Sequence, residues 1–584
     1  MMPTVADTAA TMQMNGATLK SGGCEFRVWA PKAKQVTLQL VGAGEYTMEP
    51  ESGGYFRYSA PAKAGDKYFY QVDGQKPVPD PVSRYLPEGV HGPTAIIDPN
   101  EFRWSDESWR GLDLLEYIIY ELHVGTFTPQ GTFEAVIEKL EYLKYSLGVR
   151  VIEVMPVAAF PGERNWGYDG VSPYAVQHSY GGPDGLKRLV DAAHAAGIAV
   201  VLDVVYNHLG NEGNYLRMFG PYFTDRHRTP WGEAINYDGP GSEGVRSYFV
   251  QNALYWIREY HFDGLRLDAV QNIYDESKPH ILAEIQGNVQ KLSPELGRRV
   301  CVIGETDEND ARLVRSPSRG GYGFSALWSD DFHHSVHAFL TGERQGYYQD
   351  FGKPQQMVRA LNEGFVFQGE YFNYWKRPRG TLATDVPLPA NVICLQNHDQ
   401  VGNRAFGERL TQLTSRGQRK LAAALLLLAP HTPLLFMGDE YDETNPFQFF
   451  TSYGDPELGR LVSKGRKEEF KDFGWQEIPD PQDPATFERS RLNWSLATQA
   501  NEMLRWYRAL LELRRRSVLR AERTCHAWLE NSDKTLLMQV PKENPQLLVV
   551  ADFESREEPE RPGWKLRLMA DEDGCAVRVY ERIS

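Results

Sequence analysis

Three carboxylates in this chain each end an apolar run, and they occur in the order Asp268, Glu305 and Asp399. A cation stands shortly before the first and the third of them, Arg266 and His398 respectively. Any one of these carboxylates could simply cap the helix that follows it, because apolar runs that end in Asp or Glu are common. Brought to one place, the three could cleave a glycosidic bond: one attacks, one donates a proton and one steadies the charge on the sugar.

The segments that carry these carboxylates belong to a longer alternation of strand-like and helix-like patterns. Eight apolar runs of strand length are separated by stretches in which apolar residues recur at helical spacing. The runs are Tyr117–Leu122, Val149–Met155, Ile198–Val205, Phe262–Leu267, Val300–Gly304, Ser325–Trp328, Asn391–Leu395 and Pro433–Met437, of which the sixth is the weakest. This alternation predicts the α/β class, as a parallel sheet covered on its outer side and closed into a (β/α)8 barrel. The active site is then expected at the carboxyl ends of the strands.

Other polar residues follow the same strand ends and are candidates for the same site. His208 follows the third run and is interpreted as a donor that faces a ligand, whereas Asp203 before it fits a hydrogen-bonded network at the strand end. Tyr168 lies in a Trp-Gly-Tyr-Asp stretch that could be a stacking platform for a sugar ring or a turn anchored by a core aromatic. The sequence leaves both readings of Tyr168 open.

A cluster of Asp and His residues follows the sixth run and has two interpretations. The stretch Asp330–His334 reads Asp-Asp-Phe-His-His, and His337 comes four residues after His333. Histidines at that spacing with nearby carboxylates can bind zinc. Hydroxyl-rich sugars need the same donors and acceptors, and no further Cys or His completes a tetrahedral set. Sugar binding is therefore the favoured interpretation, and we expect no metal and no cofactor.

The chain divides into regions by its patterns of alternation. Short runs that alternate apolar and polar residues are typical of antiparallel β structure, and they precede and follow the barrel pattern. The expected regions are a flexible arm (1–22), an N-terminal β-sandwich (23–99), a connector (100–116), the barrel (117–516, with an excursion at about 207–241) and a C-terminal antiparallel β domain (517–584).

Composition limits the classes of partner. The net charge of −15 argues against a nucleic-acid partner, because binding to phosphates needs a cationic face. No apolar run is long enough to span a bilayer, and residues 1–22 lack the pattern of a signal peptide, so we expect no membrane partner and a cytoplasmic location. Five cysteines without close spacing fit reduced core residues. The sequence does not distinguish a monomer from a homodimer.

Several of these motifs resemble those of a known family. Four stretches resemble the sequence signatures of the α-amylase family, glycoside hydrolase family 13: Asp203–His208, Gly264–Asp268, Gly304–Glu305 and Asn397–Asp399. Four more resemble the members of that family that release trehalose: Trp328–His334, Leu340–Glu343, Gly346–Tyr348 and His398–Arg404 running into Gly407–Arg409. The resemblance covers nearly the whole chain, and it makes the N-terminal sandwich similar to a carbohydrate-binding module.

The resemblance implies a role for each candidate catalytic residue. Asp268 would be the nucleophile, Glu305 the general acid/base and Asp399 the group that stabilises the distorted sugar, in a retaining double displacement. The implied substrate-binding residues are Tyr168, His208, Arg266, Leu267, Ala269, Val270, Gln271, Asp330, Asp331, Phe332, His333, His334, His398, Gln400, Val401, Gly402 and Asn403. Gln271 is a departure, because many relatives carry a histidine there.

The resemblance also implies a substrate. The protein would cleave the α-1,4-glucosidic bond next to the terminal trehalose unit of a maltooligosaccharide and release trehalose, with water as the final acceptor, in trehalose biosynthesis from α-glucan. One alternative is a 1,4-α-glucan branching enzyme, which has the same three carboxylates but a sugar acceptor. A second alternative, from another class, is a catalytically inactive amylase-like protein that binds glucans.

Overall fold

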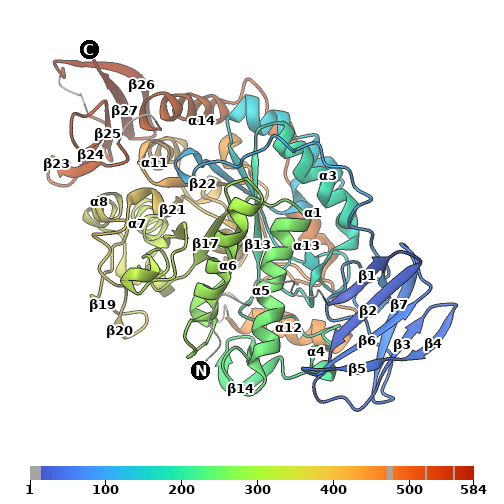
Figure 1. Ribbon diagram of the computed structural model, residues 1–584. Helices are drawn as coiled ribbons and strands as arrows, with labels where there is room; N and C mark the ends of the chain where they lie inside the picture. Colours follow the sequence, from blue (N-terminus) through green and yellow to red (C-terminus); the bar gives the residue numbers. More distant parts are fainter. Residues whose placement is uncertain (1–14, 470–477, 520–521, 557–559, 584) are drawn as a thin grey trace.

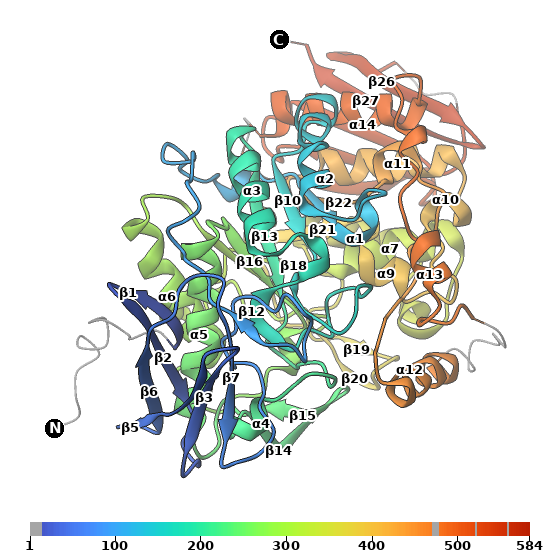
Figure 2. The same cartoon turned by 90° about the vertical axis from the view of Figure 1, so that its right-hand side faces the viewer.

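The computed structural model of the chain describes residues 15–469, 478–519, 522–556 and 560–583. Figure 1 shows a central barrel flanked by a β module at the N-terminal end and by a β sheet at the C-terminal end. Figure 2 shows the same arrangement from the side, with the two flanking parts at opposite ends of the barrel.

The N-terminal module consists of two four-stranded sheets in the orders β1-β2-β6-β5 and β4-β3-β7-β8. Alternate residues of its strands point inward and are buried, as in Phe26 and Val28 or Val36 and Leu38. The strands are β1 (Gly16–Lys20), β2 (Gly23–Trp29), β3 (Val36–Leu40), β4 (Gly44–Thr47), β5 (Glu49–Glu51), β6 (Tyr55–Ala60), β7 (Lys67–Val72) and β8 (Thr94–Ala95).

Part of the expected N-terminal arm is ordered structure instead. Residues 16–20 form β1, which pairs antiparallel with β2 and buries Ala17. This short segment has little pattern of its own, and its strand conformation depends on the partner strand, so the sequence did not indicate it. Residues 1–14 of the expected arm lie outside the described residues.

The central domain is a closed barrel of eight parallel strands, which confirms the predicted fold class. Every residue of these strands is buried, as expected for a parallel sheet covered by helices. In chain order the strands are β9 (Ile119–Leu122), β10 (Val151–Val154), β13 (Ala199–Val204), β16 (Gly264–Leu267), β17 (Cys301–Glu305), β18 (Ala326–Trp328), β21 (Asn391–Cys394) and β22 (Thr432–Phe436). All eight fall on the predicted runs, and the run with the weakest pattern gives the shortest strand, β18.

Helices surround the barrel strands and alternate with them along the chain (Figure 1). The longer ones are α3 (Gly182–Ala195), α5 (Ser242–Glu259), α6 (Ile281–Glu295), α7 (Asp330–Thr341), α8 (Pro354–Glu363), α11 (Arg416–Leu428) and α14 (Glu502–Leu513). The short ones are α1 (Val124–Phe127), α2 (Phe133–Ile137), α4 (Leu216–Phe219), α9 (His398–Gly402), α10 (Leu410–Leu413) and α13 (Pro484–Arg489). None of the described helices is both long and apolar enough to cross a membrane.

Helix α11 lies between the barrel and the C-terminal sheet. Ser415 caps its start in a reciprocal pair with Gln418, and residues 421–428 are all buried. It contacts α14 and the strands β25, β26 and β27 of a five-stranded antiparallel sheet. That sheet has the order β23-β24-β25-β27-β26, from strands β23 (His526–Glu530), β24 (Thr535–Val540), β25 (Leu547–Asp552), β26 (Trp564–Glu572) and β27 (Cys575–Arg582). Two flanking layers thus explain why residues 421–428 of α11 are apolar all round.

Several excursions leave the barrel at the carboxyl ends of its strands. The one expected after the third strand contains α4 and a hairpin of β14 (Phe223–Thr229) and β15 (Gly232–Ile235). Three more were not predicted. They carry the strand pair β11 (Ala158–Ala159) and β12 (Ser172–Val176), the pair β19 (Tyr371–Phe372) and β20 (Arg377–Pro378), and helix α12 (Pro456–Glu469). Both figures place α12 and the β14–β15 hairpin at the end of the molecule away from the C-terminal sheet.

The connector is fixed to the amino-terminal side of the barrel by a buried charged network. His194 Nδ1 lies 2.8 Å from Asp106 Oδ2, and its Nε2 lies 2.9 Å from Asp263 Oδ2. The Trp109 ring stacks on His194, and Trp109 Nε1 donates to Asp263 over 2.7 Å. Burial alone would lower the pKa of His194, but its hydrogen bonds to the two carboxylates outweigh burial and raise that pKa.

This network predicts a pH dependence of stability. The folded-state pKa of His194 is raised above its unfolded value of about 6.5, so its stabilisation is complete below that pH and is lost as pH rises through the folded pKa. We expect His194→Gln to lower the free energy of unfolding by about 3 kcal/mol at pH 6, because two carboxylates lose a buried partner. The difference in the free energy of unfolding between the two proteins should shrink toward pH 9.

Urea titrations between pH 6 and pH 9 measure this difference, with His526→Gln at an exposed position as the control. A loss that does not change with pH would contradict the assignment.

Candidate active site

Arg266 connects the acidic residues at the mouth of the barrel. Its Nη1 lies 2.8 Å from Asp203 Oδ2 and 2.8 Å from Asp268 Oδ1, and its Nη2 lies 3.6 Å from Glu305 Oε2. The guanidinium is fully buried and lies 4.2 Å from the centre of the Trp328 ring. Because β13, β16, β17 and β18 are neighbours in the barrel, their carboxyl ends deliver all four of these partners to one cation.

Asp268 is held from two sides at the end of β16. Asn207 Nδ2 donates to Asp268 Oδ2 over 2.8 Å and to its backbone oxygen over 2.7 Å, opposite the contact from Arg266. The next residue, Ala269, has φ of 40°, a left-handed conformation that turns the chain sharply. Its amide donates to Glu305 Oε2 over 2.6 Å. The turn therefore places the carboxyl groups of Asp268 and Glu305 side by side, where Arg266 contacts both.

Glu305 has the electrostatic surroundings of a proton donor. Burial raises its pKa well above the usual value, and although Arg266 opposes this, the charges of Asp268, Asp399 and Asp330 raise it further. A carboxyl group with a raised pKa keeps its proton near neutral pH, as a general acid requires.

Asp399 lies in the first turn of the short helix α9 and is partly exposed. Asn397 caps this helix by accepting hydrogen bonds from the amides of Asp399 and Gln400. Asn403 Nδ2 donates to Asp399 Oδ1 over 2.8 Å. The neighbouring His398 is paired with the buried Glu121, which ties α9 to the end of β9. The cap and the ion pair hold the helix, so the Asp399 carboxylate faces the mouth from a fixed backbone.

Tyr168 and His208 differ in what they leave available to a ligand. Tyr168 donates to Asp203 Oδ2 over 2.6 Å and stacks on His398 with ring centres 5.1 Å apart, but it stays partly exposed. His208 is buried, with Nε2 3.0 Å from the Tyr168 backbone oxygen and Nδ1 bonded to Asn207. Since both of its nitrogens have protein partners, His208 supports Asn207, and the expected ligand-facing donor is not seen there.

The residues of Asp330–His334 point in different directions because they form the first turns of α7. Asp330 is partly exposed and accepts a hydrogen bond from Gln400 over 3.1 Å. Asp331 is fully buried, paired with Arg379 at 2.8 Å, and accepts from the amides of residues 366 and 367. His333 is buried between the backbone oxygen of Leu395 and the Tyr348 hydroxyl. Asp330 is therefore the residue of this stretch that is partly exposed at the mouth, while Asp331 and His333 are held by protein partners behind it.

The histidines of this stretch have surroundings that disfavour their charged form. Burial lowers the pKa of His333 and of His334 well below the usual value, and the pKa of His337 is lowered as well. His337 Nε2 lies 2.8 Å from Glu343. Within the part of the chain that the structure describes, no group of three or more His, Cys, Asp or Glu side chains is arranged to hold a metal ion.

The predicted site residues fall into two sets by exposure. The set toward the mouth contains Asn403, which is exposed, the partly exposed Tyr168, Gln271, Asp330 and Asp399, and the largely buried Asp268 and Glu305, whose side chains are 12% and 11% exposed. Those buried behind it are His208, Arg266, Leu267, Ala269, Val270, Asp331, Phe332, His333, His334, His398, Gln400, Val401 and Gly402. In the first set, Gln271 Oε1 has no hydrogen-bond partner among the described residues. This oxygen is itself shielded from solvent, so it is an unsatisfied acceptor in the wall of the site.

Sequence reasoning did not assign site roles to Asn207 and Glu121. The first holds Asp268 and the second pairs with His398, both at strand ends. Their strand-end positions were the one available signal, and it did not distinguish them from other polar residues at the mouth.

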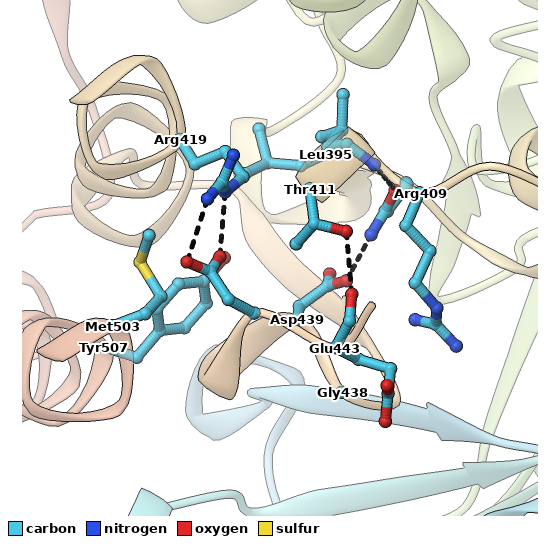
Figure 3. Close-up of a pocket in the computed structure, with 12 residues that line it drawn as sticks. Leu395, Arg409, Thr411, Arg419, Gly438, Asp439, Glu443, Met503 and Tyr507 are labelled. Carbon is cyan, nitrogen blue, oxygen red and sulfur yellow. Dashed lines mark hydrogen bonds and ion pairs between the residues drawn. The ribbon is translucent and has the colours of Figure 1, made fainter. Parts of the chain in front are cut away.

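A small cavity lies beside the site, between the ends of β21 and β22 and helix α14 (Figure 3). Its volume is about 20 Å³, which accommodates roughly one water molecule and no sugar. The polar groups that line it are paired with one another: Arg419 with Asp442, and Gln396 with Asp439. Burial raises the pKa of Asp439 to about 7. The residues that line the cavity therefore hold these loops together.

Comparisons with known proteins match most of the chain. The family model for the catalytic domain of alpha amylase matches residues 96–227, and that for carbohydrate-binding module 48, the isoamylase N-terminal domain, matches residues 13–99. The chain is 47% identical to a malto-oligosyltrehalose trehalohydrolase of Saccharolobus solfataricus, over 86% of each chain. It is 30% identical to a 1,4-alpha-glucan branching enzyme of Corynebacterium jeikeium, over 60% of this chain and 54% of that one. A crystal structure of a putative alpha amylase from Salmonella typhimurium superposes with a TM-score of 0.90 at 39% identity, covering 97% and 99% of the two chains.

The barrel, its flanking β domains and these matches define a glycosidase of the α-amylase class. At 47% identity over most of both chains, the chain belongs to the malto-oligosyltrehalose trehalohydrolase family.

Proposed function

We propose that this protein hydrolyses the α-1,4-glucosidic bond next to the terminal trehalose unit of a maltooligosaccharide and releases trehalose. The observation that carries the proposal is the cluster of Asp268 and Glu305 around Arg266, with Asp399 on the facing helix. The names of the relatives support the substrate, and the lower identity and shorter coverage of the branching enzyme make that alternative weaker.

In the proposed mechanism Asp268 attacks the anomeric carbon while Glu305 protonates the departing oxygen of the trehalose unit. A covalent glycosyl ester on Asp268 results, and trehalose leaves with the proton. Glu305, now a carboxylate, takes a proton from water as that water attacks the ester, and this step restores both residues. Arg266 and Asn207 orient Asp268 for the attack, and their contacts at 2.8 Å support this role. Asp399 stabilises the distorted sugar between the two steps.

The polar atoms that remain available at the mouth are proposed to select the trehalose end. The partly exposed side chains of Asp330 and Gln271 come from two different segments near the catalytic carboxylates. A site built to pair with hydroxyls rejects a ligand whose hydroxyls are misplaced, because its own polar groups are then left unpaired.

We expect kcat/KM for a trehalose-ended chain to exceed that for a plain maltooligosaccharide of equal length by about a hundredfold. Each lost pairing costs roughly 1–3 kcal/mol, so two of them account for this ratio. Initial rates with maltotetraosyltrehalose and maltohexaose, followed by chromatography of the products, measure it. Equal rates on the two substrates would contradict the proposed specificity. The protein would then be a glucan hydrolase without a preference for the trehalose end.

The same preparation separates hydrolysis from branching. Incubation with amylose should yield no α-1,6 linkages, which proton NMR detects directly, because water is the proposed acceptor. The anomer released first from the plain substrate should be α, since two displacements at one carbon retain its configuration. New α-1,6 signals would favour the branching enzyme instead.

A further inference from the structure

Helix α12 is anchored to the barrel although it lies outside the (β/α)8 pattern. Ser463 Oγ donates to Asp480 over 2.6 Å, and Gly459 lies so close to Gln482 that a side chain there would collide with it. Most of the helix is exposed, and Gly459 is its one buried residue. The helix therefore has a fixed position beside the mouth without contributing to the core.

One side chain of α12, Arg466, reaches back into the site. Its Nη2 donates to the backbone oxygen of Gly402 over 2.5 Å, and its Nη1 donates to Asn403 Oδ1 over 3.1 Å. Only 10% of this side chain is exposed, and the guanidinium lies 5.1 Å from the Phe449 ring centre. Its acidic partner is Glu469, one turn later in the same helix, at 3.0 Å.

These two hydrogen bonds act on the end of α9, the helix that carries Asp399. Gly402 is the last residue of α9 and Asn403 is its C-cap. Cations that donate to the last carbonyl groups of a helix stabilise its end. Gly402 packs closely on Trp166, since a Cβ added at Gly402 would lie 2.0 Å from the Trp166 ring. The end of α9 thus lies between Arg466 and the Trp166 ring.

The same contacts determine which way the Asn403 amide faces. An arginine can only donate hydrogen bonds, so the amide must turn its oxygen toward Arg466. Its nitrogen then faces Asp399 and donates to Oδ1 over 2.8 Å. A carboxylate can only accept hydrogen bonds, so Asp399 favours the same orientation, and Arg466 adds the second contact that holds this exposed amide in place. A residue of α12 therefore helps to fix the hydrogen bond to Asp399.

We propose that Arg466 is a positioning residue that works through Asn403 to orient Asp399 in the reaction. This inference rests on the proposed function, in which Asp399 stabilises the distorted sugar. Such stabilisation is stronger in the transition state than in the bound substrate, so losing the orientation lowers kcat more than it raises KM.

The test compares Arg466→Ala, Asn403→Ala and the double variant on both maltotetraosyltrehalose and maltohexaose. We expect each single variant to lower kcat roughly tenfold to a hundredfold with KM changed less than about threefold, the scale of a misplaced catalytic group. The double variant should be no slower than the slower single variant, because both changes break one chain of contacts. Arg466→Lys, which can make one of the two hydrogen bonds, should have an intermediate kcat. Arg460→Ala, on the exposed face of the same helix, is the matched control and should keep the original rates.

The outcomes separate this inference from the function on which it rests. If Asp399→Asn abolishes turnover but Arg466→Ala keeps the original kcat, the positioning role is wrong and the proposed function stands. If Asp399→Asn itself is active, the proposed role of Asp399 is wrong. Multiplied losses in the double variant would show that Arg466 acts independently of Asn403, and a lower melting temperature with unchanged kcat per folded molecule would show a merely structural role. Either result would overturn the proposal.

Discussion

Asp268→Asn is expected to lower turnover by at least about 10⁴-fold, the scale seen when a nucleophile is removed. An amide cannot form the glycosyl ester, so the first displacement has no attacking group. The Asn side chain has the same shape and can still pair with Arg266, whose Nη1 lies 2.8 Å from Asp268 Oδ1. Folding and glucan binding should therefore remain close to those of the unaltered protein. Steady-state rates, a melting curve and calorimetric titration with maltohexaose measure the three quantities.

A control and a direct chemical test accompany this variant. Asp225→Asn changes an exposed aspartate of the β14–β15 hairpin and should leave turnover unchanged. A fluorinated glucosyl donor that slows the second displacement should leave a glycosyl group on the peptide that contains Asp268, detectable by mass spectrometry. Labelling of a different carboxylate would assign the nucleophile elsewhere.

Glu305→Gln is expected to lower the hydrolysis of maltooligosaccharides by roughly 10²–10⁴-fold, the usual contribution of a general acid. The loss should depend on the leaving group. Glucosyl fluoride needs no proton to depart, so the variant should still form the ester on Asp268 from it, and added azide should then release an α-glucosyl azide. An equal loss on both substrates would contradict the assignment of Glu305 as the acid.

The pH dependence gives an independent check on Glu305. Its pKa is raised by burial and by the neighbouring carboxylates, and the protonated form is the active one. Activity of the unaltered protein on maltooligosaccharides should therefore persist at neutral pH and fall as pH rises through that pKa. This alkaline limb should be absent when Glu305→Gln acts on glucosyl fluoride, because no acid is then needed. A limb that persists there would belong to another group.

The sequence by itself determined the barrel and the identity of the three carboxylates. Buried parallel strands need continuous apolar runs, and covering helices need apolar residues at helical spacing, so both patterns are local and readable. The barrel rule then places every strand end at one mouth. This reasoning selected Asp268, Glu305 and Asp399 as candidates without coordinates, and the motif resemblance indicated the family that the comparisons show.

The direction of each side chain was decided only by the tertiary structure. The stretch Asp330–His334 begins a helix, in which successive side chains turn by about 100°, so its five residues cannot all face one ligand. Asp331 is bound by Arg379 from a loop 48 positions later (379 − 331), and no local pattern reveals such a partner. Likewise, His208 Nε2 is hydrogen-bonded to the backbone oxygen of Tyr168, which lies in the excursion after a different strand, β10.

The excursions were also beyond the reach of local patterns. Strand β1 forms because it pairs with β2. Helix α12 contacts the site through the hydrogen bond from Arg466 to Asn403, which lies 63 positions earlier in the chain (466 − 403). Contacts of this kind depend on how the whole chain closes, since the energy of a hydrogen bond is realised only when both groups arrive together. The sequence thus indicated which residues could do the chemistry, and the packing of distant segments decided which of them lie at the mouth and which are buried behind it.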